Sequence, residues 1–142
     1  MTPQDMARLH AAAFTLDRPW QAAEFASLMD SPLVLRIAVD HGFALTRTVA
    51  RESELLTIAV DPAHQRQGIA RGLMQHWLST RPQDADSAFL EVAADNAPAI
   101  ALYAQMGFGR IATRKAYYAR ASGPAVDALI LRRDLTHGQP PQ

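Results

Sequence analysis

The sequence contains no cysteine, so disulfide bonds, thiolate metal sites and a cysteine nucleophile are all excluded. It has no apolar run near the roughly 20 residues that a membrane-spanning helix needs, and its first residues lack the pattern of a signal peptide. It has no net charge either, because 14 basic residues balance 14 acidic ones, which removes a general attraction to nucleic acid or anionic membranes. These absences predict a cytoplasmic protein with neither a membrane nor a nucleic acid as partner.

The chain has a suitable length for one domain, and 49% of its 142 residues are apolar, so it can bury a hydrophobic core. Helical spacing of apolar residues predicts helices over 3–14, from Pro19 onward, over 68–80 and over 96–106. Runs typical of strands cover 33–39, 43–50, 54–60, 88–93, 109–118 and 126–132. We therefore predict one mixed α/β domain over residues 1–135, with helices flanking a central sheet, and a disordered tail at 136–142.

Glycine and arginine are concentrated in the stretch DPAHQRQGIARG, residues 61–72, between a predicted strand and a predicted helix. The first turn of a helix leaves backbone N–H groups without internal partners, and the helix dipole adds partial positive charge, so this junction can hold a phosphate. Gly68 has no Cβ and lets the backbone approach a pyrophosphate closely. The stretch lacks both Gly-Lys-Ser/Thr and Gly-x-Gly-x-x-Gly, so it is neither a P-loop nor a Rossmann turn. The alternative is that Gly68 and Gly72 only permit close packing of the helix.

Two blocks of the sequence carry a resemblance to a known family. Gln65-x-x-Gly68-x-Ala70, after LLTIAVDP, resembles the Q/R-x-x-G-x-G/A signature of the GNAT N-acetyltransferases, and LEVAADNAPAIALYAQMGF (90–108) resembles their second diagnostic block. The resemblance implies a mostly antiparallel sheet flanked by helices. The chain begins at its first helix, where the family has a preceding strand, so either the sheet lacks its first edge strand or the sequence starts too late.

The resemblance implies acetyl-CoA as the cofactor, a co-substrate, and assigns residues to it. Backbone N–H groups of the phosphate loop wrap the pyrophosphate, and the main chain of the preceding strand bonds the pantetheine arm. The residues of the loop are Gln65, Arg66, Gln67, Gly68, Ile69, Ala70 and Arg71, and those of the strand are Ile58, Ala59 and Val60. The alternative for Ile58 and Val60 is that they are ordinary core residues of a strand.

Glu91 stands out because every neighbour in the predicted strand AFLEVA is apolar. Burying a charge without partners is costly, and burial raises the pKa of a carboxyl group, which makes it a better base near neutrality. The alternative is a carboxylate at an edge or in an ion pair. The family resemblance places the general base at Glu91, acting directly or through a water molecule.

Asn96 and Tyr103 lie seven residues apart in one predicted helix, so they share a face. Asn96 fits the N-cap of that helix, and the family resemblance adds a contact with the cofactor. The resemblance makes Tyr103 the acid that protonates the leaving thiolate, a transfer that is little uphill for a hydroxyl with a pKa of about 10. The alternative is that Tyr103 is a plain core aromatic residue.

Within the family, the sequence is most similar to enzymes that acetylate the N-terminal alanine of a small-subunit ribosomal protein. Two further parts of the sequence match these enzymes: Pro19-Trp20 with Phe25, and the pair Tyr117-Tyr118. Side chains alternate along a strand, so only one of the two tyrosines can face a peptide groove. We therefore expect acetyl transfer to a protein or peptide N-terminus, by direct attack within a ternary complex.

Other interpretations stay open at this stage. The acceptor could instead be a lysine or a small-molecule amine, or the chain could be a non-catalytic acetyl-CoA-binding module. A basic segment containing Arg110, Arg114, Lys115 and Arg120 is either a solvated face or a site for a phosphate or an acidic substrate segment. The five histidines show no ligand spacing, so no metal is expected. We expect a monomer or a weak dimer.

Overall fold

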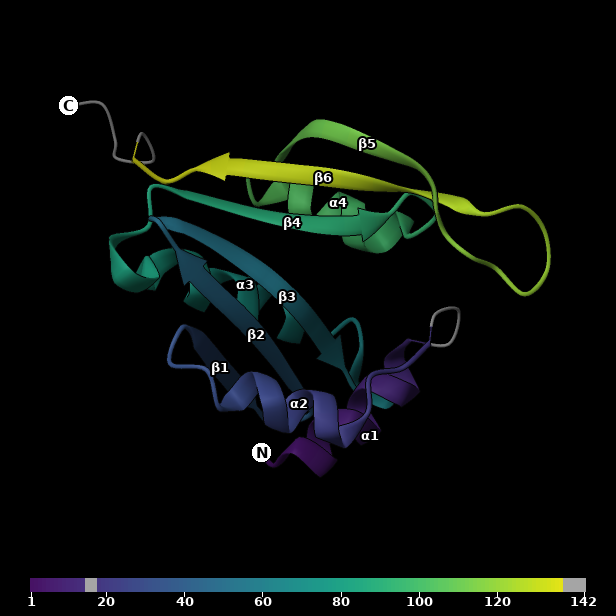
Figure 1. Cartoon of the computed structure of the whole chain (residues 1–142), viewed down its shortest axis with the longest axis horizontal. Coiled ribbons are helices and arrows are strands. Elements are labelled where there is room, and N and C mark those ends of the chain that lie inside the picture. The colour runs from purple at the N-terminus through teal and green to yellow at the C-terminus, as the bar shows by residue number, and fades with distance from the viewer. Residues whose placement is uncertain (15–17, 137–142) are drawn as a thin grey trace.

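The computed structural model describes residues 1–14 and 18–136, which form helices on both faces of one six-stranded sheet (Figure 1). The helices are α1 (Pro3–Ala13), α2 (Ala22–Met29), α3 (Ile69–Thr80) and α4 (Ala97–Gln105), with two short 3-10 helices, η1 (Pro62–His64) and η2 (Pro82–Asp84). The strands are β1 (Val34–Val39), β2 (Gly42–Val49), β3 (Glu52–Val60), β4 (Ser87–Ala93), β5 (Gly109–Tyr118) and β6 (Val126–Asp134). Each strand and helix predicted from the sequence is present, with ends displaced by a few residues. The predicted disorder of the tail concerns residues that, after Thr136, lie outside those described.

The helix ends follow from local chemistry. Thr2 and Asp5 form a capping box at the start of α1, in which each side chain bonds the backbone N–H of the other residue. Gln21 and Glu24 form a similar box at the start of α2. Gly107, with a φ of 91°, follows α4 in the left-handed conformation that commonly terminates helices.

The sheet has the order β1-β2-β3-β4-β6-β5, and every neighbouring pair is antiparallel except β3 and β4. This confirms the predicted mixed, mostly antiparallel sheet. Within the described residues no strand precedes α1, and β1 forms one edge of the sheet. None of the described helices is both long and apolar enough to cross a bilayer.

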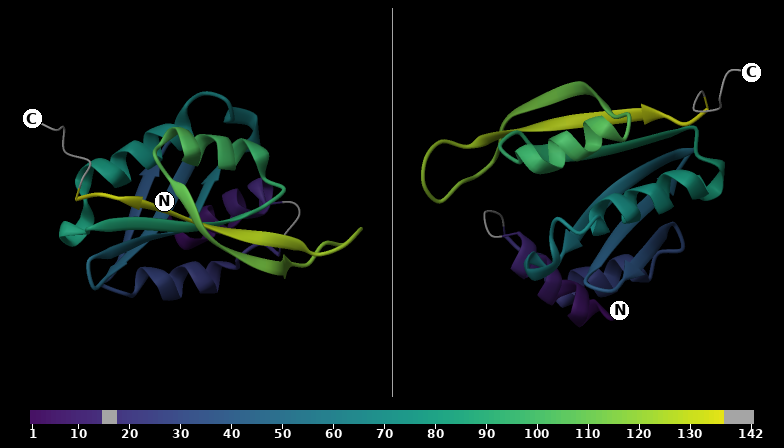
Figure 2. Two further views of the ribbon diagram at one scale, coloured as in Figure 1. Left: turned by 90° about the horizontal axis from the view of Figure 1, so that it is seen from above. Right: turned by 180° about the vertical axis from the view of Figure 1, so that it is seen from behind.

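Hydrophobic side chains fill both faces of the sheet. Helices α1 and α2 cover one face of β1–β3, where Phe25 packs against Phe43, and α3 and α4 lie on the opposite face (Figure 2). The larger core lies under α3 and α4 and includes Trp77, Leu90 and Leu131. The alternation of β2 explains the division, because Phe43 and Leu45 face α1 and α2 whereas Ala44 faces α3.

Candidate active site

Strands β3 and β4 pair at one end only. Their parallel register joins Glu52 to Ser87, Ser53 to Ala88 and Glu54 to Phe89, and stops there. Beyond that point the two strands diverge (Figure 1), so β4 pairs with none of the β3 residues from Leu55 to Val60. Along this part of β3, the backbone groups on the side of β4 therefore form no hydrogen bonds with β4.

The predicted phosphate loop follows directly from the diverging end of β3. It runs through η1 and the exposed residues Gln65–Gly68 into α3. Gly68 is the N-cap of α3 in the left-handed conformation (φ 79°), and no described side chain caps the first turn of this helix. The N–H groups of that turn are left for another partner, as an anion site requires.

The alternative interpretation of the two glycines, that they permit close helix packing, is wrong. A Cβ built at Gly68 or at Gly72 meets no atom within 4 Å. At Gly68 the backbone conformation therefore explains the glycine, because φ values near 79° are unfavourable for residues with a Cβ. The open space at Gly68 is free for a ligand. The guanidinium of Arg71 bonds the side chain of Gln105 and so joins the first turn of α3 to the end of α4.

The carboxylate of Glu91 lies on β4 with two polar partners from β5. The hydroxyl of Tyr118 donates a hydrogen bond to Oε2 over 2.9 Å, and Nη1 of Arg114 lies 3.7 Å from Oε1. The Glu91 side chain is 27% exposed. The prediction of a carboxylate buried among apolar groups was therefore wrong, and the alternative, an ion pair, is present. The neighbours of Glu91 in the sequence are apolar, but its polar partners come from β5, which lies beyond β6 in the sheet and is distant in the sequence.

An irregularity in β5 directs Tyr118 toward Glu91. The register of β5 with β6 shifts between Arg114 and Tyr118, and Ala116 within this segment has a φ of 49°. The ring of Tyr117 stands nearly perpendicular to that of Tyr118 and is exposed, so only one of the two reaches the carboxylate. That one of the two tyrosines faces a peptide groove stays a prediction.

Tyr103 lies on the buried face of α4 with 6% of its surface exposed. Burial raises the pKa of its hydroxyl to about 12. The pKa of about 10 assumed from the sequence was therefore too low, because that value belongs to a solvated phenol. At the start of the same helix, the side chain of Asn96 accepts a hydrogen bond from the N–H of Ala99 over 3.3 Å, which confirms the predicted N-cap.

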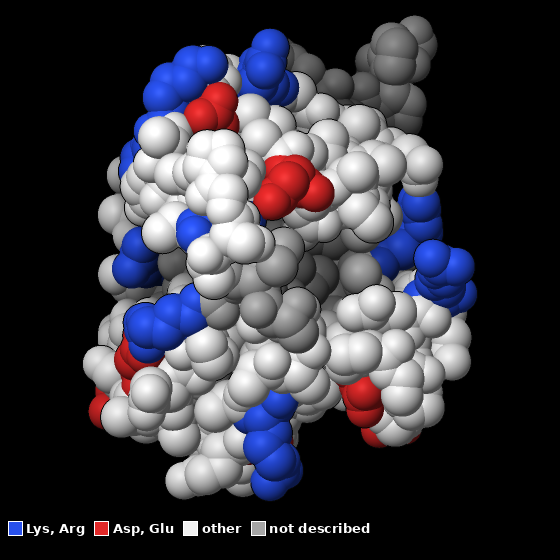
Figure 3. Space-filling model, turned by 90° about the vertical axis from the view of Figure 1, so that its right-hand side faces the viewer, with Lys and Arg blue, Asp and Glu red and all other residues white. Residues whose placement is uncertain are grey.

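Much of the basic segment of β5 and its flank is paired with acids. Besides Arg114 with Glu91, Lys115 lies 3.4 Å from Asp127 and Arg120 lies 3.0 Å from Asp95. Sequence reasoning missed these acids because they come from β6 and from the turn after β4. Figure 3, which faces the right-hand side of Figure 1, shows basic and acidic side chains interspersed over this side of the molecule.

Residues 8–108 match the model of the "Acetyltransferase (GNAT) family". The "[Ribosomal protein bS18]-alanine N-acetyltransferase" of Escherichia coli is 37% identical over 118 residues, which cover 80% of this chain and 79% of the relative. The "N-alpha-acetyltransferase RimI" of Mycobacterium tuberculosis is 38% identical over 140 residues, which cover 92% of this chain and 85% of the relative.

A solved structure agrees with these sequence matches. The crystal structure of the ribosomal-protein-S18-alanine N-acetyltransferase from Escherichia coli superposes with a TM-score of 0.83 and 32% identity. The superposition covers 96% of this chain and 89% of that one. The likeness therefore extends through the diverging strands, the loop and the helix of Tyr103.

Proposed function

The chain belongs to the GNAT family and is an N-acetyltransferase, and we propose that it transfers the acetyl group of acetyl-CoA to the α-amine of a protein N-terminus. Its acceptor is an N-terminal alanine of a ribosomal protein. The observation that carries this proposal is the identity of 37–38% with two enzymes named for N-terminal acetylation, over 80–92% of the chain. The diverging β3 and β4, with Glu91 on β4, support it.

Acetyl-CoA binds along the edge of β3 that β4 leaves unpaired. Main-chain groups of Ile58, Ala59 and Val60 bond the pantetheine arm, because an amide-containing chain can replace the missing strand. The pyrophosphate lies against the first turn of α3 and the loop from Gln65 to Arg71, where N–H groups and the helix dipole favour an anion. Asn96, at the start of α4, adds a contact from the β4 side.

Glu91 and Tyr103 move the two protons of the reaction. The neutral amine attacks the thioester carbonyl, a C–N bond forms, and the C–S bond breaks. Glu91 takes the proton from the nitrogen, directly or through water, while Tyr103 gives its proton to the departing sulfur. With a pKa of about 12, Tyr103 holds its proton throughout the physiological range. A thiol has a pKa of about 8.5, so full transfer from Tyr103 is uphill by roughly 5 kcal/mol, and the hydroxyl acts first as a hydrogen-bond donor to the developing thiolate.

The environment of Glu91 suits an α-amine better than a lysine. A terminal amine has a pKa of about 7.7–8.0 and is roughly a tenth neutral at pH 7, whereas lysine at about 10.4 is almost fully protonated. The Glu91 carboxylate is 27% exposed and accepts a hydrogen bond from Tyr118, so an amine that is already neutral can give it a proton. An α-amine needs no more than that.

The acceptor is tested with one peptide in two forms. The peptide begins with alanine and contains an internal lysine, and in its control form the α-amine is already acetylated. We expect mass spectrometry to locate the new acetyl group on the α-amine of the free peptide and to find no product with the blocked one. Acetylation of the blocked peptide would favour a lysine acetyltransferase. Turnover only with polyamines or other small amines would favour a small-molecule acceptor, and acetyl-CoA binding without turnover on any amine would favour a non-catalytic module.

A further inference from the structure

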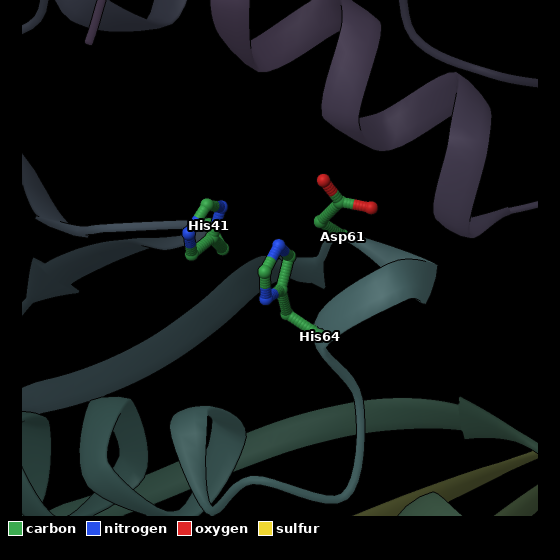
Figure 4. Close-up of side chains that lie close together, drawn as sticks. All are labelled: His41, Asp61 and His64. Atoms are coloured by element: carbon green, nitrogen blue, oxygen red, sulfur yellow. The ribbon is translucent and has the colours of Figure 1, made fainter.

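We propose that His41, Asp61 and His64 form a binding site for one divalent transition-metal ion of the Zn²⁺ class. The three side chains lie close together at one end of the sheet (Figure 4). His41 lies in the turn between β1 and β2, Asp61 directly follows β3, and His64 ends η1. One ligand atom from each residue lies within 4.8 Å of one from each of the others.

The backbone brings these distant residues together. Gly42 pairs with Val60, which places the turn of His41 beside the end of β3, and the N–H of Asp61 donates to the carbonyl of His41 over 2.8 Å. Asp61 and His64 are three residues apart across η1, so their side chains lie on the same side of one turn. The side-chain oxygen Oδ1 of Asp61 also accepts a hydrogen bond from the N–H of Ala63 over 3.0 Å, which orients the carboxylate.

Two imidazoles and one carboxylate are the ligand types that Zn²⁺, Co²⁺ and Ni²⁺ accept. Three protein ligands leave at least one coordination position for water. A cavity of about 380 Å³, bordered by His41 and Asp61 and by Asp5 and Arg8 of α1, opens beside the cluster and gives room for that water. The positive charge of Arg8 is offset by its ion pair with Asp5.

The side chains of the two histidines must rotate to bind a metal. Their rings are stacked, with centroids 3.5 Å apart and planes 11° from parallel, so their in-plane lone pairs do not converge on one point. Rotation about the side-chain bonds can bring one nitrogen of each ring toward Asp61, while the hydrogen bond between Asp61 and His41 keeps the backbones in place. His41 is exposed, and the other two residues are half-buried, so this rotation does not disturb the core.

A metal at this site would fix the residue that immediately precedes the phosphate loop. His64 is followed directly by Gln65, so an ion shared with β1–β2 and β3 would tie the start of the loop to the sheet. The binding site itself does not depend on the proposed function. Only this link to the loop rests on it, and metal binding is therefore measured separately from acetyl transfer.

The site is tested on the whole chain without a histidine tag, after treatment with a chelator. Zn²⁺ is titrated by calorimetry, and Co²⁺ is titrated by visible absorption, which reports ligand number and geometry. We expect one ion per chain. His64→Ala, Asp61→Asn and His41→Asn should each weaken binding at least tenfold, since losing even a supporting residue of a metal site costs 10–100-fold. Asparagine is chosen at position 41 because His41 has a φ of 68°, which asparagine tolerates.

The control variant is His76→Ala, which removes an exposed histidine of α3 outside the cluster. It should bind the metal as the wild type does. Circular dichroism and melting temperature establish that each variant is folded. No binding by the wild type, or an equal loss in His76→Ala and His64→Ala, would overturn the proposal and indicate scattered surface binding.

Discussion

The two residues proposed to move protons differ in their surroundings, and the difference fits their tasks. Tyr103 is 6% exposed, and its pKa of about 12 keeps the hydroxyl protonated until a thiolate forms beside it. Glu91 keeps a side chain that is 27% exposed, with Tyr118 and Arg114 as partners, so an incoming amine can reach it. The proposed acid is buried, and the proposed base is accessible.

Replacing Tyr103 by phenylalanine removes one hydroxyl and keeps the ring that packs against Phe108. We expect single-turnover acetylation to fall by roughly 10²–10⁴-fold, the range for a positioned acid. The affinity for acetyl-CoA should change little, because the hydroxyl acts as the thiolate forms. Below about pH 10 the remaining activity should follow the wild-type pH profile, since a group with a pKa of about 12 does not titrate there. Turnover equal to that of the wild type would remove Tyr103 from the reaction.

At the scale of elements, the N-terminal end of α3, where we propose that the pyrophosphate binds, begins at a glycine in the left-handed conformation. Gly68 has a φ of 79° and open space around the position of its absent Cβ. A side chain at this position strains the backbone but collides with nothing in the protein. A substitution at Gly68 can therefore affect acetyl-CoA binding in two separable ways, through backbone strain and through the charge of the new side chain.

Gly68→Asp and Gly68→Asn make that division, because the two side chains have nearly the same shape and both tolerate a positive φ. A carboxylate about 4 Å from a phosphate costs roughly 4 kcal/mol at an effective dielectric constant of 20, which is near a thousandfold in affinity. We expect calorimetry to find acetyl-CoA binding abolished in the aspartate variant and weakened much less in the asparagine variant, with similar melting temperatures. Equal binding by the two would contradict a pyrophosphate at this position.

The paired ends of β3 and β4 depend on a buried polar contact with α3. Ser53 is fully buried, and its hydroxyl accepts hydrogen bonds from Nε1 of Trp77 over 2.8 Å and from Thr48 over 3.0 Å. The hydroxyl of Ser87 at the same seam is also buried, but it has no hydrogen-bond partner among the described residues. The hydroxyl of Ser53 therefore contributes hydrogen bonds to the folded state, and within the described residues that of Ser87 does not.

Removing these two oxygens should have different effects on stability. Ser53→Ala leaves the buried N–H of Trp77 without its acceptor, which should lower the free energy of unfolding by about 1–3 kcal/mol. Ser87→Ala deletes a hydroxyl with no partner, so it should be neutral or slightly stabilising. Urea unfolding of both variants measures the difference. A loss for Ser87→Ala as large as that for Ser53→Ala would indicate a partner for Ser87 and contradict this account.

The helices and strands could be predicted from the sequence because their signals are local. Apolar spacing defined α3, Asn96 marked the start of α4, and the glycine after α4 marked its end. The divergence of β3 from β4 could not be predicted, since it depends on the register of strands far apart in the chain. The same holds for the bond between Tyr118 and Glu91, which needs β6 between β4 and β5 and an irregular β5.

At the scale of the whole molecule, the short pairing between β3 and β4 separates the sheet into two halves, and each half is built from one continuous part of the sequence. The half β1-β2-β3, with α1, α2 and α3, comes from residues up to Thr80, and the half β4-β6-β5, with α4, comes from residues from Ser87 onward. Three residue pairs join the two strands at this seam. The halves also share the larger hydrophobic core, and polar contacts such as Arg71 with Gln105 and Arg51 with Asp86, just before β4, join them.

A chain cut in η2, between Gln83 and Asp84, should therefore reassemble from two separate polypeptides. Both residues have a positive φ and lie at the surface, so a break there costs little ordered structure. Each fragment alone exposes its side of the shared core and should be poorly folded, whereas mixing 1–83 with 84–142 should restore a folded complex. In the proposed site acetyl-CoA contacts residues of both fragments, so it should tighten their association, and ultracentrifugation with and without it measures the gain. Fragments that fold alone would show that neither half depends on the shared core, and association that acetyl-CoA does not tighten would show that it does not bridge the two halves.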